Sequence, residues 1–346
     1  MSKKSSRNNS RQGVVSPRKN KAVLIITLAL ICIVGTTILA QVNSRRKGKE
    51  ASGEVSIQGF TAAKPTREMI YAGIRLVASE GGYSISPTYQ SFAGNGSTAA
   101  ATINVTAPSG APWTAASNQS WVTITSGSSG TGNGTTSYSV AVNSGSVIRS
   151  TTITVNSQTF TVYQGINFTD VPSNHQFYDY IGRLAARGVT LGCGTGIYCP
   201  DTPVIHEQMS AFVIRALGMP DPPPPPSQRF ADVPSSNVSY YAFIEQMGAR
   251  GIWNGCGGGN YCPANAVLRE QMAAIVMRSR GEFNPPTPPT QRFDDVPPTN
   301  QYYNFIDRMA VLGITLGCNA SPPWYCPGDS VTRGQMAAFL VRAYNL

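Results

Sequence analysis

The chain has 346 residues and a formal net charge of +10, and an excess of basic residues of this size is typical of proteins that bind nucleic acid. Residues 1–50, however, hold 11 of the 27 Lys and Arg side chains and a single acid, Glu50, which leaves 16 basic and 16 acidic side chains for all the rest. Because phosphate binding needs a clustered positive surface on the folded part, this distribution excludes a nucleic-acid-binding protein.

An uncharged apolar run, Ala22 to Ala40, follows a basic cytoplasmic tail, residues 1–21. As a helix the run spans roughly 28 Å, close to the thickness of a bilayer's hydrocarbon core. Seven cations precede it and four follow it, which predicts a cytoplasmic N-terminus and an exported remainder. The run is longer than the apolar core of an ordinary signal peptide and so favours an uncleaved inner-membrane anchor, whereas cleavage near Ala40 would give a secreted protein.

Residues 41–80 are predicted to be a linker, in which Glu68 to Glu80 alternates around Gly73 and suits a small hairpin or an edge strand. The composition then changes, because residues 81–164 contain one charged side chain, Arg149. Period-2 runs such as ATINVTA, TSYSVAVN and STTITVN follow one another with turn residues between them. Many short strands rich in Thr and Val predict an antiparallel β-sandwich.

The order WTAASNQSWVTIT, GTGNG, S-x-V-x-V and RSTTITV resembles the BACON family across nearly all of this segment. The resemblance suggests a carbohydrate-binding role. Trp113 and Trp121 are the candidate platforms for sugar stacking, on an exposed face. Both tryptophans also lie on alternating strands, where a large aromatic residue usually belongs to the core. A neutral spacer therefore fits the segment as well as a sugar-binding module does.

Three copies of one pattern fill the second half of the chain. Each copy opens with F-x-D-V-P and continues through G-[VI]-x-x-G-C and Y-C-P to a helical stretch built on Q-M-[SA]-A. Apolar residues at i, i+4 and i+7 predict a helix on each side of the Cys loop. Because the copies recur at a fixed spacing, each is predicted to be a structural unit that buries its apolar face against its neighbours. The copies cover residues 166–218, 228–281 and 291–346.

These copies resemble S-layer homology (SLH) repeats through F-x-D-V, G-[VI]-x-x-G and the start of the second helix. The resemblance implies an all-α, pseudo-threefold helical bundle with grooves between its lobes. It also implies non-covalent attachment to a cell-wall or envelope polysaccharide.

Six cysteines fall in pairs, one pair in each copy. A structural zinc site needs four ligands, yet each loop offers two, and the chain has only two histidines. In an exported protein three local disulfides are the better explanation, and no metal site is expected. The predicted pairs are Cys193 with Cys199, Cys256 with Cys262, and Cys318 with Cys326.

The start of each second helix is the predicted ligand site, because SLH repeats carry a T-R-A-E-like motif there whose Arg lines the polysaccharide groove. The third copy has Arg333 with Gln335, the second has Arg269 with Gln271, and the first has His206 in the Arg slot. An Arg in the first turn lies at the positive end of the helix dipole, which is unfavourable for a cation, so a bound anion would stabilise it there. Helix N–H groups plus a guanidinium suit a carboxylate, such as a ketal-pyruvate or a uronic acid.

Simpler explanations exist for the same residues. Thr332 with Gln335 three positions on is a capping box that needs no ligand. Arg269 and Arg333 could instead pair with an acid of a neighbouring copy, Asp232 or Asp295. The Asp of each F-x-D-V-P motif is expected at a turn or helix entry. Three arginines late in the second helices are expected to be solvated or structural, namely Arg215, Arg278 and Arg342.

The predicted architecture is thus multidomain: an N-terminal transmembrane or signal helix, an all-β sandwich and an all-α bundle. The predicted function is non-catalytic attachment to an envelope polysaccharide, acidic or pyruvylated, with no cofactor. Membrane contact would run through residues 22–40, and the protein would lie in the cell envelope, anchored or wall-attached after cleavage. The alternative is a secreted adhesin whose β-sandwich binds external carbohydrate.

Overall fold

The computed structural model describes residues 67–72 and 75–346 of the chain. The basic tail, the apolar run of residues 22–40 and most of the predicted linker lie outside the described residues. Within the part that is described, no helix combines the length and the apolar character that crossing a bilayer requires. The end of the predicted linker forms a two-stranded antiparallel hairpin, β1 (Arg67–Ala72) with β2 (Arg75–Gly81).

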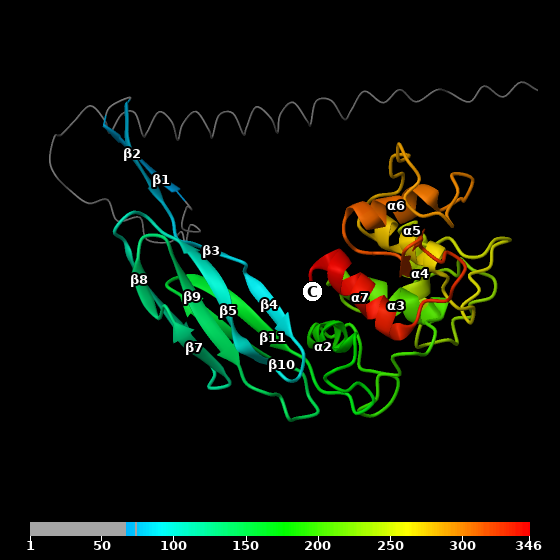
Figure 1. Ribbon diagram of the computed structural model, residues 1–346, viewed down its shortest axis with the longest axis horizontal. Coiled ribbons are helices and arrows are strands. Elements are labelled where there is room, and N and C mark those ends of the chain that lie inside the picture. The colour runs from blue at the N-terminus through cyan, green and yellow to red at the C-terminus, as the bar shows by residue number, and fades with distance from the viewer. Residues whose placement is uncertain (1–66, 73–74) are drawn as a thin grey trace, which may run out of the picture. The chain divides into compact units, whose positions relative to one another are not determined.

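Nine short strands then build a β-sandwich, as the alternating pattern predicts (Figure 1). One sheet has the order β4 (Tyr89–Phe92), β11 (Gln158–Gln164), β10 (Arg149–Val155), β6 (Pro112–Ser117) and β8 (Ser129–Thr131). The other has the order β3 (Ser84–Ser86), β5 (Ser97–Thr106), β9 (Gly134–Val140) and β7 (Val122–Ser126). The pairing is antiparallel except between β4 and β11, which run parallel.

Alternate side chains along the strands point between the two sheets, and these buried side chains form the core of the sandwich. Tyr138 of β9 and Phe160 of β11 are fully buried, and their rings meet edge to face with centroids 5.4 Å apart. Trp113 of β6 packs beside them at 4% exposure. Gly130 and Gly134 lie so close that a Cβ on either residue would meet the indole ring at 2.4 and 2.6 Å. Those two positions therefore have to stay glycine while Trp113 fills the core.

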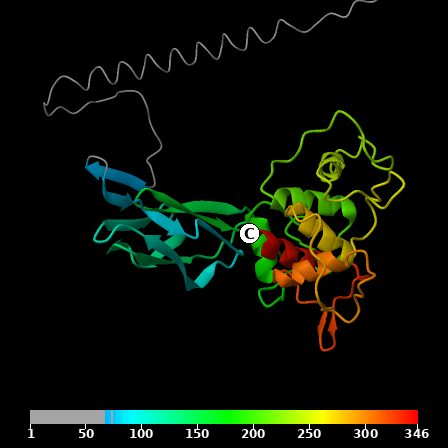
Figure 2. The same cartoon turned by 90° about the horizontal axis from the view of Figure 1, so that it is seen from above.

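Six helices follow, two in each copy of the repeat (Figure 1). They are α2 (Tyr178–Ala186) and α3 (His206–Ala216) in repeat 1, α4 (Tyr241–Ala249) and α5 (Arg269–Ser279) in repeat 2, and α6 (Tyr303–Val311) and α7 (Arg333–Tyr344) in repeat 3. The predicted apolar stripes are buried in one shared core. A small hairpin, β12 (Asn319–Ala320) with β13 (Pro323–Trp324), projects from the loop of repeat 3 (Figure 2).

The three repeats close into a ring. The second helix of each repeat packs against the first helix of the next: α3 on α4, α5 on α6 and α7 on α2. At the centre, Val204 N–H donates to Val331 O, Val331 N–H to Val267 O, and Val267 N–H to Val204 O, at 2.8–2.9 Å. One valine from each repeat thus completes a cyclic set of backbone bonds, the pseudo-threefold closure that the resemblance implied.

Candidate functional site

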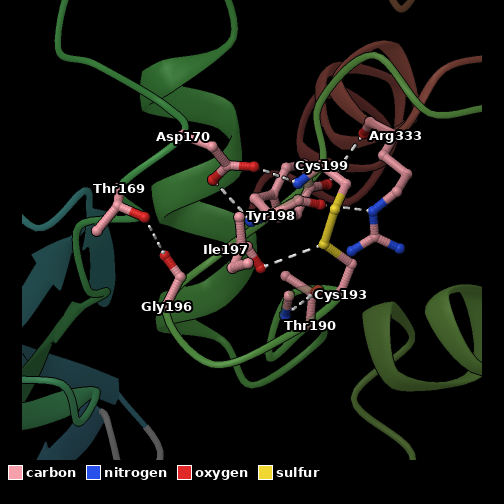
Figure 3. The surroundings of a disulfide bond; sticks show 10 residues. Thr169, Asp170, Thr190, Cys193, Gly196, Ile197, Tyr198, Cys199 and Arg333 are labelled. Carbon is pink, nitrogen blue, oxygen red and sulfur yellow. Dashed lines mark hydrogen bonds between the residues drawn. A yellow bond between two sulfur atoms is a disulfide. The ribbon is translucent and has the colours of Figure 1, made fainter.

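The Asp of each F-x-D-V-P motif holds the disulfide loop of its own repeat. In repeat 1 the Asp170 carboxylate accepts from the backbone N–H groups of Tyr198 at 2.8 Å and Cys199 at 2.7 Å (Figure 3). Cys199 has φ 60°, in the left-handed region, and is tied to Cys193 by the predicted disulfide. Asp232 and Asp295 accept from the equivalent groups in the other repeats, where the two remaining disulfides also form as predicted.

Each loop Tyr reaches the start of a second helix in another repeat. Arg333 Nε donates to Tyr198 O at 2.7 Å, and Tyr198 Oη donates back to Arg333 O at 2.9 Å. The Arg333 guanidinium also lies over the rings of Tyr198, at 4.7 Å, and Phe212, at 5.2 Å. The side chain is therefore held at three points, and its orientation toward the loop of repeat 1 can be followed in Figure 3.

Arg269 repeats this arrangement between repeats 2 and 3. Its Nε donates to Tyr325 O at 2.7 Å, and Tyr325 Oη donates to Arg269 O at 2.7 Å. The guanidinium lies 4.8 Å from the Tyr325 ring centre and 5.5 Å from that of Phe339. Two of the three sequence-predicted cation sites are thus built to one plan.

Both arginines keep a vacant hydrogen-bond donor. Each residue is 4% exposed, yet Nη2 of each has no hydrogen-bond partner among the described residues. Asp232 and Asp295 form no ion pair with them, and their carboxylates accept from loop N–H groups instead. Asp170 favours the charged form of Arg333 through its charge, without an ion pair between the two side chains. Burial lowers the pKa of Arg333, which expresses the cost of holding the cation out of water. An anion that reached Nη2 would satisfy the donor and offset this cost.

The helix N–H groups do not share in this site, contrary to the expectation from sequence. Arg333 N–H donates to Thr202 O at 2.9 Å and Gly334 N–H to Pro200 O at 2.8 Å. The same bonds recur in the other repeats, with the chain after each Y-C-P motif acting as the acceptor. Because the neighbouring repeat already takes these donors, any anion must be bound by the guanidinium and side chains around it.

The two predicted glutamines act first as helix caps. Gln335 completes the capping box with Thr332: its N–H donates to Thr332 Oγ1 and its Oε1 accepts from Thr332 N–H. Gln271 Oε1 likewise accepts from Leu268 N–H at 2.9 Å. Gln208, in the same slot of repeat 1, instead has a buried Oε1 that finds no hydrogen-bond partner in the described part of the chain. Sequence reasoning missed Gln208 because nothing in the motif distinguishes it from the two capping glutamines.

His206 occupies the third equivalent position and behaves differently. It is 2% exposed, and its ring stacks on Trp253 with centroids 5.0 Å apart and planes 14° apart. Its Nε2 lies 3.2 Å from Gln271 Oε1, and burial lowers the pKa of the imidazole. A neutral ring covered by an indole does not supply the charge that Arg269 and Arg333 supply.

This histidine makes the stability of the bundle depend on pH. Because the pKa of His206 is lowered in the fold, the unfolded chain binds its proton first as pH falls below about 6.5, so stability is lost on acidification. We expect wild type to lose more stability than His206→Gln between pH 6.5 and 5.5, by at most the one-proton limit of about 1.4 kcal/mol per pH unit. Urea unfolding at both pH values measures this, and equal losses in the two proteins would contradict it.

A hollow of about 270 Å³ opens at Arg333. We call it groove 1; it is lined chiefly by Leu191, Gln208, Phe212, Arg215, Tyr240 and Arg333. Both vacant polar atoms of this region, Arg333 Nη2 and Gln208 Oε1, belong to lining residues. Both atoms are themselves buried beneath the lining, and by their chemistry the donor suits a carboxylate and the acceptor a hydroxyl group.

The tryptophans of the sandwich differ in their surroundings. Trp113 is a core residue, and its indole N–H donates to Gly132 O at 2.9 Å, which favours the core alternative over sugar stacking. Trp121 is half-buried, and the Arg149 guanidinium lies 4.3 Å from its ring centre. Arg149 further donates to Gln164 Oε1 and to the carbonyls of Ala141 and Val142. One face of Trp121 is therefore already covered by a fixed cation.

Comparison with known proteins matches two family models to adjacent segments. Residues 111–165 match the BACON family, described as a putative binding domain, and residues 167–210 match the S-layer homology domain. The chain is 27% identical over 182 residues to a cell surface protein of Thermoanaerobacter kivui, and 29% identical over 198 residues to an amylopullulanase of Thermoanaerobacterium thermosulfurigenes. These matches cover 52% and 55% of this chain but only 21% and 10% of the relatives.

A search of solved structures finds a Bacteroides ovatus GH5 xyloglucanase, 17% identical, with a TM-score of 0.21 over 38% of this chain and 25% of that one. The family matches fall on the two folds described above, the β-sandwich and the first helical repeat. Two adjacent segments of the chain, residues 111–165 and 167–210, are thus similar to the BACON family and to the S-layer homology family.

Proposed function

We propose that this protein is a non-catalytic cell-envelope protein that attaches to an acidic wall polysaccharide through its three helical repeats. In this proposal repeats 2 and 3 are SLH units like repeat 1, since they share its loop, its helices and its Asp-to-loop bonds. The observation that carries the proposal is the pair of buried arginines, Arg269 and Arg333, each with an unpartnered Nη2. Buried donors in proteins almost always have a hydrogen-bond partner, and a bound anion is one partner that would satisfy these two.

The chemistry of the two sites favours a carboxylate on a sugar. An arginine fork binds a carboxylate through charge-assisted hydrogen bonds, and the aromatic rings around it suit the C–H face of a pyranose. Both the ketal-pyruvate and the uronic acid expected from sequence meet this description. The His206 position lacks the charge, so we assign acidic-sugar binding to two of the three positions.

Support for an exported location comes from the three disulfides, which persist in oxidising compartments. The matched domains are of a binding and anchoring kind, and one relative is a cell surface protein. Retention in the inner membrane through residues 22–40 stays a prediction from the sequence. In this proposal the sandwich separates the repeats from the membrane or from the rest of the N-terminal chain.

The test is co-sedimentation of the oxidised full chain with sacculi of the host bacterium. One set of sacculi keeps its accessory polysaccharides, and a matched set is stripped of them by acid. We expect the chain to pellet with the first set and to stay in solution with the second. Equal pelleting with both sets would point to peptidoglycan itself, and no pelleting with either would refute wall attachment.

A further inference from the structure

Groove 1 does not end at Arg333 and Arg215. A second hollow, of about 570 Å³, shares Leu191 and Arg215 with it and adds Arg187 and Asp221. A third, of about 370 Å³, shares Arg187 and Gly188 with the second and adds Arg149 and Tyr163 of the sandwich. The three hollows therefore follow one another along the surface, and each shares two lining residues with the next. We call their four cations, Arg333, Arg215, Arg187 and Arg149, the arginine track.

The track is strongly unbalanced in charge. Its linings contain four guanidinium groups and a single carboxylate, that of Asp221. Asp221 accepts two bonds from Arg215, at 2.9 Å from Nε and 2.8 Å from Nη2. The other three cations have no ion-pair partner among residues 67–72 and 75–346. A depression lined by one sign of charge concentrates ligands of the opposite sign.

The cations of the track are held in place before any ligand arrives. Arg187 lies over Tyr163 at 4.1 Å and over Tyr89 at 4.8 Å, while Arg149 is fixed between Trp121 and its three acceptors. Ordering these long side chains in advance reduces the entropy that binding would otherwise cost. Leu191, 76% exposed between the first two hollows, offers an apolar contact of the kind that a sugar ring can cover.

We propose that the arginine track binds successive acidic residues of one extended polysaccharide strand, which runs from groove 1 past the end of α2 onto the rim of the BACON domain. This inference rests on the proposed function and enlarges its site from one sugar to several. It assigns Arg215 and Arg187 as binding residues, in place of the structural role expected for Arg215 from sequence. It also gives Asp221 a role as the internal counter-ion, which the strand displaces from Arg215.

The experiment measures affinity as a function of chain length. Polysaccharide released from host sacculi is fractionated into short fragments of about two repeating units and long fragments of about six, and each is titrated calorimetrically into the oxidised full chain. We expect Arg333→Gln to weaken both fragments. Arg187→Gln should weaken the long fragment about tenfold, the loss of one charge-assisted contact, and leave the short one within about twofold. Arg292→Gln, which removes an exposed cation outside the track, is the control and should change neither.

Variants of the Arg215–Asp221 pair separate binding from structure. If Asp221 is a displaced counter-ion, Asp221→Asn tightens the long fragment several-fold while Arg215→Gln weakens it. If the pair is merely structural, both variants act in the same direction, which overturns the inference. If Arg187→Gln binds the long fragment as tightly as wild type does, the inference is overturned as well. The wall-attachment proposal still holds in that case, provided that wild type binds the fragments and Arg333→Gln does not. Failure of wild type to bind sacculi or either fragment refutes both proposals.

Discussion

Replacing Arg269 and Arg333 together by glutamine is expected to weaken binding of the full chain to polysaccharide-bearing sacculi by about 10²- to 10⁴-fold. Each guanidinium is buried, carries a donor without a partner and forms no ion pair with a carboxylate of the described residues. A hydrogen bond to a charged group contributes roughly 1.5–3 kcal/mol, and each 1.4 kcal/mol is a factor of ten, so two such sites give the stated range. Co-sedimentation isotherms at fixed ionic strength measure the change.

The controls distinguish binding from folding. Arg333 Nε also donates to Tyr198 O, so the replacement removes an inter-repeat contact as well as a ligand contact. The double variant Arg269→Lys, Arg333→Lys keeps both charges but loses the paired N–H donors of the guanidinium. We expect its binding affinity to fall between that of wild type and that of the double glutamine variant. Arg292→Gln removes an exposed cation away from both sites and breaks its ion pair with Asp307, so it reports the effect of lost charge outside the sites. A double glutamine variant that unfolds like wild type and binds with unchanged affinity would contradict the site assignment.

The positions of the local elements follow from pattern alone. Alternation of apolar and polar residues is sufficient to find the strands of the sandwich, because the side chains of a strand alternate between its two faces. The i, i+4, i+7 spacing likewise places Ile181 and Leu184 on the buried face of α2. Close spacing of the Cys pairs is sufficient for the disulfides. These predictions succeed because each depends on neighbours in sequence.

Long-range partnerships could not be read in this way. A period of about sixty residues indicates that repeats stack but does not say that the third closes on the first, as Arg333 does with Tyr198. The bond from Tyr198 N–H to Asp170 joins residues 28 apart, whereas the sequence predicts only a turn or helix-entry role for that Asp. The cyclic closure also explains why the first-turn N–H groups are unavailable to a ligand, since another repeat occupies them.

The departure at His206 was visible in sequence, but its consequence was not. Repeats 1 and 3 carry Thr190 and Thr315 at the loop position where repeat 2 carries Trp253. Only the fold shows that this indole stacks on His206, so that two substitutions in different repeats meet at one site. The position has exchanged a buried cation for a buried aromatic pair, which fits a structural role there.

Reducing the three disulfides is expected to lower the unfolding temperature of the helical bundle by roughly 15–25 °C. Each bridge closes a short loop and stabilises the fold by roughly 2–3 kcal/mol in the loop-closure model, or about 7 kcal/mol for all three. A change of 1 kcal/mol shifts the midpoint of a domain of this size by about 2–4 °C. Calorimetry of the full chain with and without dithiothreitol measures the shift.

The chain supplies its own control for this experiment, because residues 81–164 contain no cysteine. Hydrogen exchange by mass spectrometry should therefore show faster exchange in the repeats of the reduced protein and little change in β9, β10 and β11. Exchange that accelerates equally in the sandwich, or in neither part, would contradict the prediction.

Cysteine replacements refine the prediction, because Cys199, Cys262 and Cys326 all have φ between 57° and 60°. Glycine adopts this left-handed conformation without the cost of about 1–2 kcal/mol that an L side chain incurs. Of two variants that lack all three bridges, the one with Gly at these positions should therefore unfold at a higher temperature than the one with Ala. The order follows because the Asp carboxylates still bind the loop N–H groups and hold the backbone in place after the sulfur bridges are gone.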